Sequence, residues 1–336
     1  MPQDTTPTEA RFAVILNANA RRVSQEVAER VGEVVPPEDL FLSSSAEEAA
    51  TIADQIVRRG YGTVFAGGGD GTVMDFINHI SRVPPEQRPA VGILKLGTGN
   101  AMSRLVSSGN VLADLSTFSA TTPRDVFSLG LVEAEGRRFP FFGLGLDAEI
   151  LNDYKAVKRM AQGRLMQRLA GSVSGYFFAF AMRTVPRFMG RALLRRQARV
   201  RAVALDEPVL LVAPDGTELR RYAPGETIFE GKVLSSFGGT VPYYGYGLKI
   251  LPLAGTDPQR MHLRIAELGL PRATANLGSL WRGTYAGPGI HNFLATAVRL
   301  EHDREMPFQM GGDAEGYRRE VEFRMVPDAV RLLHLL

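Results

Sequence analysis

The chain has 336 residues, of which 45% are hydrophobic and 22% are charged, and it contains no cysteine. This composition is typical of a soluble globular protein of about two domains, and it excludes disulfide bonds, a thiolate nucleophile and a zinc site with cysteine ligands. The formal net charge is only +3, which by itself predicts no partner.

The first part of the chain predicts a parallel α/β domain. Short apolar runs lie at residues 12–16, 40–42, 63–66 and 91–94. Helical patterns follow them at residues 23–31, 46–59, 73–80 and 101–106. Strands that alternate with helices are typical of a parallel sheet, which binds ligands beyond the carboxyl ends of its strands. We therefore expect the chemistry in the loops that follow the strands.

The second part of the chain has a different pattern. Many short apolar segments are broken by Gly and Pro, most densely between residues 208 and 252, which is typical of antiparallel strands. We expect an α/β domain over residues 10–123 and a β-rich antiparallel domain with a basic helical insertion over residues 124–324. We expect the C-terminal segment, 325–336, to return to the first domain.

The glycine-rich segment AGGGDGT, residues 66–72, is the strongest local signal. It joins a predicted strand to a predicted helix, and its glycines permit positive φ angles and a close approach to a ligand. The start of a helix presents unpaired N–H groups to an anion. Phosphate would repel Asp70 unless a cation lay between them, so Asp70 predicts Mg²⁺ bound to a nucleotide. The alternative is an ordinary turn between strand and helix. The predicted nucleotide contacts here are Gly67, Gly68, Gly69, Asp70, Gly71 and Thr72.

A similar segment, LGTGN, ends the next predicted strand. We expect its last four residues to contact the same phosphate chain, with Asn100 capping a helix that begins at Ala101. Asn17 and Ser43 end the two earlier strands at the same edge and complete the predicted rim, although each alone is more often a cap or turn residue. The four residues of the LGTGN segment are Gly97, Thr98, Gly99 and Asn100.

These motifs resemble the catalytic domain of the diacylglycerol kinase family, which includes bacterial lipid kinases, sphingosine kinases and ceramide kinases. The family pattern reads GGDGT followed by an acid and an Asn, here Asp75 and Asn78, and then LGTGN. Further pieces occur in the expected order: LNANAR at residues 16–21, FFGLGLDAEI at 141–150 and GGDAE at 311–315. The resemblance covers nearly the whole chain and implies a fold like that of NAD kinase and diacylglycerol kinase.

The resemblance also implies the chemistry. In this family the glycine-rich loops hold ATP, and the late acidic pair supplies the general base, so Asp313 and Glu315 become the base and its partner. Which of the two acts as the base stays open. The flanking glycines predict a loop that swings toward the phosphates. Phosphoryl transfer agrees with these roles, because it needs in-line positioning, charge neutralisation and one proton acceptor.

Three features depart from the family pattern. Lys95 and Ala101 flank LGTGN where the family usually has Pro and an acid, and Ala314 replaces the Gly of the late motif. Tyr246 stands where an Asp often contributes to a structural Mg²⁺ site, so we do not expect that accessory metal.

Trp281 could line an acyl channel, but a place in the core is the more common role of such a residue.

The basic residues are concentrated in one segment. Residues 155–201 contain twelve Lys or Arg and no acid, so the rest of the chain, with 27 of the basic and all 36 acidic residues, carries −9. Cations interleaved with aromatic residues are typical of a segment that lies on an anionic membrane. The alternative is a pair of packed helices with solvated faces. Nucleic acid is not expected, because no binding module accompanies the segment.

We therefore expect a cytoplasmic, peripheral membrane enzyme that uses ATP and Mg²⁺ to phosphorylate a diacylglycerol-like or sphingoid lipid. No apolar stretch is long enough to span a bilayer. An NAD kinase-like small-molecule kinase and a regulator that binds a nucleotide or lipid without turnover remain alternatives. The lipid and the oligomeric state stay open, with a homodimer as one option.

Overall fold

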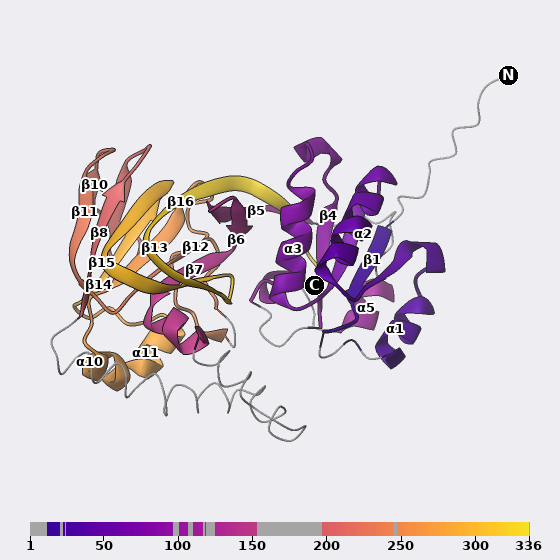
Figure 1. The fold of residues 1–336 in the computed structure, drawn as a ribbon, viewed down its shortest axis with the longest axis horizontal. Coiled ribbons are helices and arrows are strands. Elements are labelled where there is room, and N and C mark those ends of the chain that lie inside the picture. Colours follow the sequence, from indigo (N-terminus) through magenta and orange to yellow (C-terminus); the bar gives the residue numbers. More distant parts are fainter. Residues whose placement is uncertain are drawn as a thin grey trace. The chain divides into compact units, whose positions relative to one another are not determined.

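The computed structural model divides the chain into two compact units. Unit 1 comprises Met1–Gly130, Gly245–Gly247 and Pro327–Leu336, and unit 2 comprises Leu131–Tyr244 and Leu248–Val326. Figure 1 shows the elements of both. The structure describes residues 12–20, 23, 25–96, 101–106, 110–116, 118, 125–152, 197–244 and 247–335.

Unit 1 contains the predicted parallel sheet. Its strands are β1 (Phe12–Asn17), β2 (Leu40–Ser43), β3 (Thr63–Gly68) and β4 (Ala90–Lys95). They lie in the order β2-β1-β3-β4, and each neighbouring pair is parallel. The end of β16 (Asp313–Leu333) pairs with the outer side of β4, also in parallel, through Leu332 and Val91. The chain that follows β16 donates to unit 1 twice more, from His334 N to Asp125 O and from Leu335 N to Val106 O.

Helices cover both faces of this sheet. They are α1 (Gln25–Gly32), α2 (Ala46–Arg58), α3 (Asp70–Ile80), α4 (Ser103–Val106) and α5 (Val111–Ser116), with short 3-10 turns at Pro37–Asp39 and Pro85–Gln87. Val14, Leu16 and Phe65 pack with α1 and α5 on one face. Because successive strand residues point to opposite faces, their neighbours face α2 and α3, which pack against each other. The residues of β1, β3 and β4 are therefore buried nearly throughout, whereas β2, at the edge of the sheet, is more exposed.

Unit 2 is the predicted antiparallel domain. Its strands are β5 (Val126–Ala134, which begins in unit 1), β6 (Arg137–Phe139), β7 (Phe141–Gly145), β8 (Ala198–Ala204), β9 (Val209–Val212), β10 (Glu218–Tyr222), β11 (Thr227–Val233), β12 (Ser235–Gly239), β13 (Met261–Ala266), β14 (Ile290–Ala295), β15 (Ala297–Met310) and most of β16. The main path is β10-β9-β14-β13-β12-β7-β15-β16, and β8 pairs with β11 and β15. The described part of this unit also contains helical residues 146–152, which follow β7, and two short helices, α10 (Leu270–Ala275) and α11 (Leu277–Arg282).

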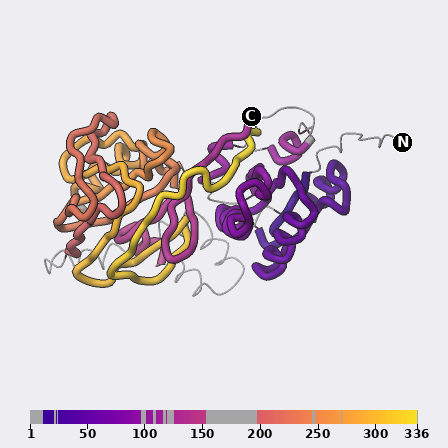
Figure 2. Tube along the Cα trace, turned by 90° about the horizontal axis from the view of Figure 1, so that it is seen from above, coloured from indigo at the N-terminus to yellow at the C-terminus, as the bar shows by residue number. Residues whose placement is uncertain are grey.

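The core of unit 2 lies directly beneath the long β15–β16 hairpin, which Figure 2 shows in orange and yellow. The rings of Phe142 and Phe323 stack with centroids 3.6 Å apart, and Phe308 meets Phe323 edge-on at 6.0 Å. All three side chains are fully buried, and they come from β7, β15 and β16. These contacts fix the three strands against one another.

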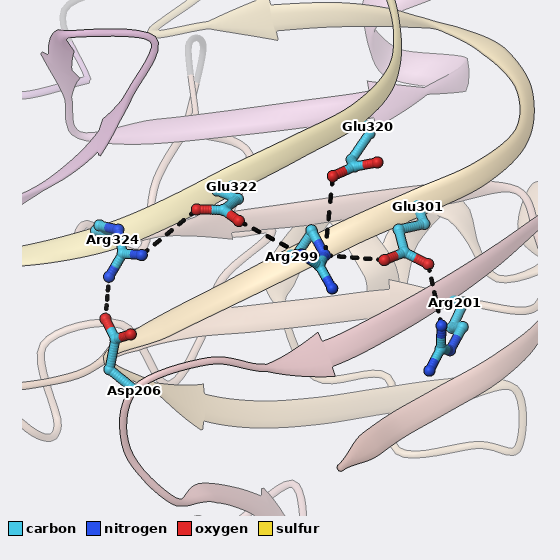
Figure 3. A network of polar contacts seen from close by, with 7 residues as sticks. All are labelled: Arg201, Asp206, Arg299, Glu301, Glu320, Glu322 and Arg324. Atoms are coloured by element: carbon cyan, nitrogen blue, oxygen red, sulfur yellow. Dashed lines mark hydrogen bonds and ion pairs between the residues drawn. The ribbon is translucent and has the colours of Figure 1, made fainter. Parts of the chain in front are cut away.

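An ionic network lies on the exposed surface of the same hairpin (Figure 3). Arg299 Nε lies 2.8 Å from Glu301, and its Nη1 lies 3.6 Å from Glu322, the residue opposite it on β16. The network continues through Arg201 and Glu301 on one side and through Glu322, Arg324 and Asp206 on the other. Cross-strand charge pairs favour one register, although exposed pairs contribute less than about 1 kcal/mol each. The network therefore supports the alignment of β15 with β16.

Candidate functional site

The glycine-rich junction of unit 1 is tighter than the sequence predicted. Strand β3 continues through Gly68 and helix α3 begins at Asp70, so that Gly69 alone connects them. None of the glycines at this junction has a positive φ, and Gly69 is extended at φ −87°. The expectation of left-handed glycines was therefore wrong.

The glycines are required instead by packing and access. A Cβ on Gly67 would lie 2.4 Å from Leu16 Cδ2, and a Cβ on Gly68 would lie 2.8 Å from the Thr72 side chain. A Cβ on Gly69 would meet nothing within 4 Å. Gly69 therefore faces open space at the N-terminus of α3, where it provides no side-chain cap to the first amides. Such a helix start can bind an anion.

Asp70 connects this junction to the end of the next strand. Its Oδ2 accepts a hydrogen bond from Ala101 N at 3.0 Å and its Oδ1 accepts one from Met102 N at 3.4 Å. Gly68 pairs with Lys95 in the sheet, so both strands end at the same edge. The predicted contacts Gly97, Thr98, Gly99 and Asn100 lie outside the described residues, but the chain on both sides of them is held at this edge.

The helix after the LGTGN segment begins later than predicted. Residues 101 and 102 form a turn, and α4 starts only at Ser103. The backbone amides of residues 101 and 102 donate to Asp70, as described above. The Asp70 carboxylate thus holds residues 101 and 102, which the sequence had assigned to the start of a helix.

The rim residues have protein partners. Asn17 Nδ2 donates to Thr72 Oγ1 at 2.9 Å, which fixes the end of β1 against the first turn of α3. Ser43 is buried, and its hydroxyl lies 3.5 Å from the carbonyl oxygen of Leu16. On α3, Asp75 is exposed and Asn78 donates to Met74 O at 2.9 Å.

The late acidic motif lies at the tip of the β15–β16 hairpin in unit 2. Gly311 and Gly312 form its turn with φ angles of +58° and +92°, and Met310 pairs with Asp313 across it. Two-residue hairpin turns with positive φ at both positions match the twist of the strands. The predicted swinging loop is therefore a tight turn, and Asp313 is exposed at the first position of β16.

The two acids of this motif have different surroundings. Glu315 Oε1 accepts a hydrogen bond from Arg137 Nη1 at 2.8 Å, and the Glu315 side chain is only 22% exposed. Arg318 donates to the Glu315 carbonyl oxygen at 3.0 Å and also pairs with Glu135. Glu315 is thus held by Arg137, and Asp313 is the more exposed of the two acids.

Asp147 is a candidate that the sequence analysis did not select. It follows β7, and Gln309 Nε2 lies 3.4 Å from its Oδ2 while Gln309 Oε1 accepts from Gly312 N at 2.8 Å. Its other oxygen, Oδ1, is buried without a hydrogen-bond partner among the described residues. Burial raises the pKa of Asp147 from 3.8 to about 6, against the opposing effect of its hydrogen bonds to Ala148 and Gln309.

This buried carboxyl group contacts the turn that carries Asp313 through one amide side chain. A Cβ on Gly143 would lie 1.7 Å from Asp147 Oδ2, so a glycine is required there. The signal in the sequence was the GxGxD spacing of Gly143, Gly145 and Asp147. The carboxyl group of Asp147 lies over Gly143, where only a glycine leaves room for it.

Metal and membrane features are limited in the part of the chain that the structure describes. No group of three or more His, Asp or Glu side chains in it could hold a metal ion, and none of its helices is long and apolar enough to cross a membrane. Trp281 is exposed on α11 rather than placed in the core. Most of the basic segment, residues 155–196, and Tyr246 lie outside the described residues.

Part of the chain matches a known family model. Residues 11–128 match the family model described as "Diacylglycerol kinase catalytic domain". Diacylglycerol kinase 2 of Arabidopsis thaliana is 26% identical over 179 residues, which are 46% of this chain and 25% of that protein. A probable lipid kinase YegS-like protein of Cronobacter sakazakii is 32% identical over 122 residues, 36% of this chain and 34% of that one. The chain thus spans about a quarter to a third of these relatives' length.

A solved structure matches the whole fold. The crystal structure of a diacylglycerol kinase from Bacillus anthracis str. Sterne superposes with a TM-score of 0.62 and covers 97% of this chain and 98% of that one. The sequences are 16% identical, so this similarity concerns the fold. It confirms the predicted combination of a parallel α/β domain with a β-rich antiparallel domain.

Proposed function

Because residues 11–128 belong to the diacylglycerol kinase catalytic-domain family, we propose that the protein is an ATP-dependent lipid kinase that phosphorylates a hydroxyl group of a diacylglycerol-like or sphingoid lipid. The observation that carries the proposal is the hydrogen bonding of Asp70 to Ala101 and Met102, within the matched domain. It joins two glycine-rich strand ends at one edge of a parallel sheet, where phosphate groups bind.

Unit 1 binds the nucleotide in this proposal. The open backbone at Gly69 and the first amides of α3 receive the phosphates, and the Asn17–Thr72 hydrogen bond keeps that turn in place. A single carboxylate, Asp70, fits a Mg²⁺ ion that arrives with the nucleotide, because Mg²⁺ is commonly bound by one or two carboxylates plus substrate phosphates. Bound Mg²⁺ supplies charge neutralisation for the phosphates.

Asp313 acts as the general base. It accepts the proton of the lipid hydroxyl while that oxygen bonds to the γ-phosphorus of ATP and the bond from the γ-phosphorus to the bridging oxygen breaks, which releases ADP. Arg137 holds the carboxylate of Glu315, which makes Glu315 the supporting partner. Gln309 and Asp147 support the turn from the buried side. The acceptor is taken from a membrane surface, which the basic segment 155–201 contacts.

The direct test supplies labelled ATP and Mg²⁺ to the purified protein with mixed micelles of diacylglycerol, sphingosine or ceramide. We expect one lipid to be labelled, and NAD to remain unlabelled in a parallel reaction. Asp313→Asn is expected to lower kcat by about 10²–10⁴-fold with unchanged ATP affinity, and Glu315→Gln to lower it less. Asp70→Ala is expected to weaken ATP binding.

Three results would contradict the proposal. Labelling of NAD instead of lipid would identify a small-molecule kinase. ATP binding without transfer to any lipid would identify a regulator. Full activity of the Asp313→Asn protein would remove that residue from the mechanism, and Glu315→Gln serves as its matched comparison on the same hairpin.

A further inference from the structure

The pair α10–α11 in unit 2 presents large apolar side chains to solvent. Leu277 is 52% exposed and Trp281 is 37% exposed. They are four residues apart on α11, so they lie on the same side of the helix. Tryptophan is enriched where proteins meet the membrane interface, because its large ring is apolar and its N–H group is polar.

The fold fixes which side of the pair faces outward. Ala273, Leu280 and Tyr285 pack inward against a buried cluster of Leu234, Ala266 and Leu268. The helix is anchored further by a hydrogen bond from Lys249 N to Trp281 O at 2.9 Å, and it ends at Gly283 in the left-handed conformation. Because the inward positions are filled, Leu277 and Trp281 remain on the surface.

The two charged residues of the α10–α11 pair, Arg272 and Arg282, are both basic and exposed. The nearest acid that precedes the pair in the sequence is the exposed Glu267, which lies 3.2 Å from His291. Exposed apolar side chains flanked by arginines, without acids, complement a surface that is anionic outside and apolar just beneath, which is the interface of an anionic bilayer.

We propose that the outer face of α10–α11, formed by Arg272, Leu277, Trp281 and Arg282, inserts into the interface of an anionic lipid membrane. Leu277 and the Trp281 ring enter the boundary between headgroups and acyl chains, and the two arginines bind lipid phosphates. The four residues of this surface lie outside the basic segment 155–201 in the sequence. The inference rests on the proposed function in one respect, because a lipid kinase has to reach its substrate in a bilayer. Its test measures membrane binding and requires no catalytic turnover.

The chain contains a built-in reporter for this contact, because Trp281 is its single tryptophan. The experiment titrates the full-length protein, without ATP, with vesicles of phosphatidylcholine and phosphatidylglycerol and records intrinsic fluorescence. We expect a blue shift of Trp281 emission on binding, quenching by lipids brominated near the headgroup end of the acyl chain, and a weaker response with phosphatidylcholine alone or at high salt.

Variants that retain Trp281 locate the surface. Arg282→Gln is expected to weaken partitioning into anionic vesicles roughly fivefold, the equivalent of about 1 kcal/mol per cation. Leu277→Ser is expected to reduce both the affinity and the blue shift. Leu219→Ser is the matched control, because Leu219 is 63% exposed on β10, outside the proposed surface, and should bind as the unmodified protein does. Trp281→Ser is tested by vesicle co-sedimentation.

Each contrary outcome is distinct. Vesicle binding with unchanged Trp281 emission would overturn the proposal and assign the contact to another surface. A blue shift that depends on protein concentration without vesicles would assign the face to a second copy of the chain. Failure of the lipid kinase assay with intact Trp281 insertion would refute only the proposed function. Activity of Leu277→Ser on a dispersed short-chain lipid should be unchanged, and its loss would indicate a folding defect.

Discussion

Replacing Asp147 by Asn is expected to change how the stability of unit 2 depends on pH. Asp147 as a whole is partly buried and its Oδ1 atom is fully buried, and this burial raises the pKa of the carboxyl group to about 6 from an ordinary 3.8. The folded protein therefore binds a proton more tightly at this position than the unfolded chain does. Asn has nearly the same shape and an amide that hydrogen-bonds Gln309, but it cannot ionise. The substitution thus removes the titration and keeps the packing.

The size of the effect follows from the pKa difference. About two pKa units at 1.36 kcal/mol each correspond to on the order of 3 kcal/mol. Between pH 3.8 and 6 the folded state holds more protons than the unfolded state, so the free energy of unfolding falls as the pH rises. The loss is nearly complete one pH unit above 6. Because the unfolded carboxyl group is already more than half ionised at pH 4, the unmodified protein should lose roughly 2 kcal/mol relative to Asp147→Asn between pH 4 and pH 7.

Two buried histidines in unit 2 change the free energy of unfolding with pH in the opposite direction. Burial lowers the pKa of His262 from 6.5 to about 3 and that of His302 from 6.5 to about 4. Both lower the free energy of unfolding as the pH falls below 6.5, because the unfolded chain takes up their protons first. They are present in both proteins, so their contribution cancels in the difference between the protein and its variant.

The assay is urea unfolding followed by Trp281 fluorescence, which reports on unit 2 because the chain has no other tryptophan. Midpoints and slopes are measured for both proteins between pH 4 and pH 8. A constant offset between them would reflect the substitution itself. The reasoning is refuted if the difference does not change with pH, because Asp147 would then titrate alike in the folded and unfolded states.

The remaining predictions concern both units. Gly67→Ala should destabilise unit 1 by about 1–3 kcal/mol in thermal unfolding, because its Cβ overlaps the Leu16 side chain. Gly69→Ala should leave the melting temperature unchanged but weaken ATP binding in calorimetry, and equal ATP affinities would remove this position from the phosphate site. Arg137→Met should cost less than about 1 kcal/mol of stability, since the pair is partly exposed, yet lower kcat by releasing Glu315. Unchanged kcat would show that this ion pair is dispensable.

The sequence predicted the elements of unit 1 better than their junctions. Alternating apolar runs identify the strands because a sheet covered on both faces buries nearly every strand residue. The glycines were interpreted as conformational, whereas Gly67 and Gly68 are needed because Leu16 and Thr72 occupy the space of a side chain. The contact of Gly67 with Leu16 joins residues far apart in sequence, so the local pattern could not reveal it.

In unit 2 the features that the sequence did not predict also depend on contacts between residues far apart in the chain. The antiparallel class followed from short segments broken by Gly and Pro, but the order of the strands depends on long-range pairing. Asp147 was missed because only the fold places Gln309 between it and the hairpin turn. For Trp281 the core was the more common of two alternatives, the other being the wall of an acyl channel, but Ala273 and Leu280 already fill inward positions of α10–α11.

Unit 1 cannot complete its sheet until the end of β16 has been synthesised, because this segment pairs with the outer side of β4. Arg331 of β16 donates to the backbone of Arg88, just before β4, across 243 residues of sequence. A fragment limited to residues 11–128 would therefore leave one edge of its sheet unpaired, and exposed edges promote aggregation. During synthesis on the ribosome the same edge stays open until the whole second unit has been translated. Unit 1 is thus discontinuous in sequence, and its folding is completed only after that of unit 2 has become possible.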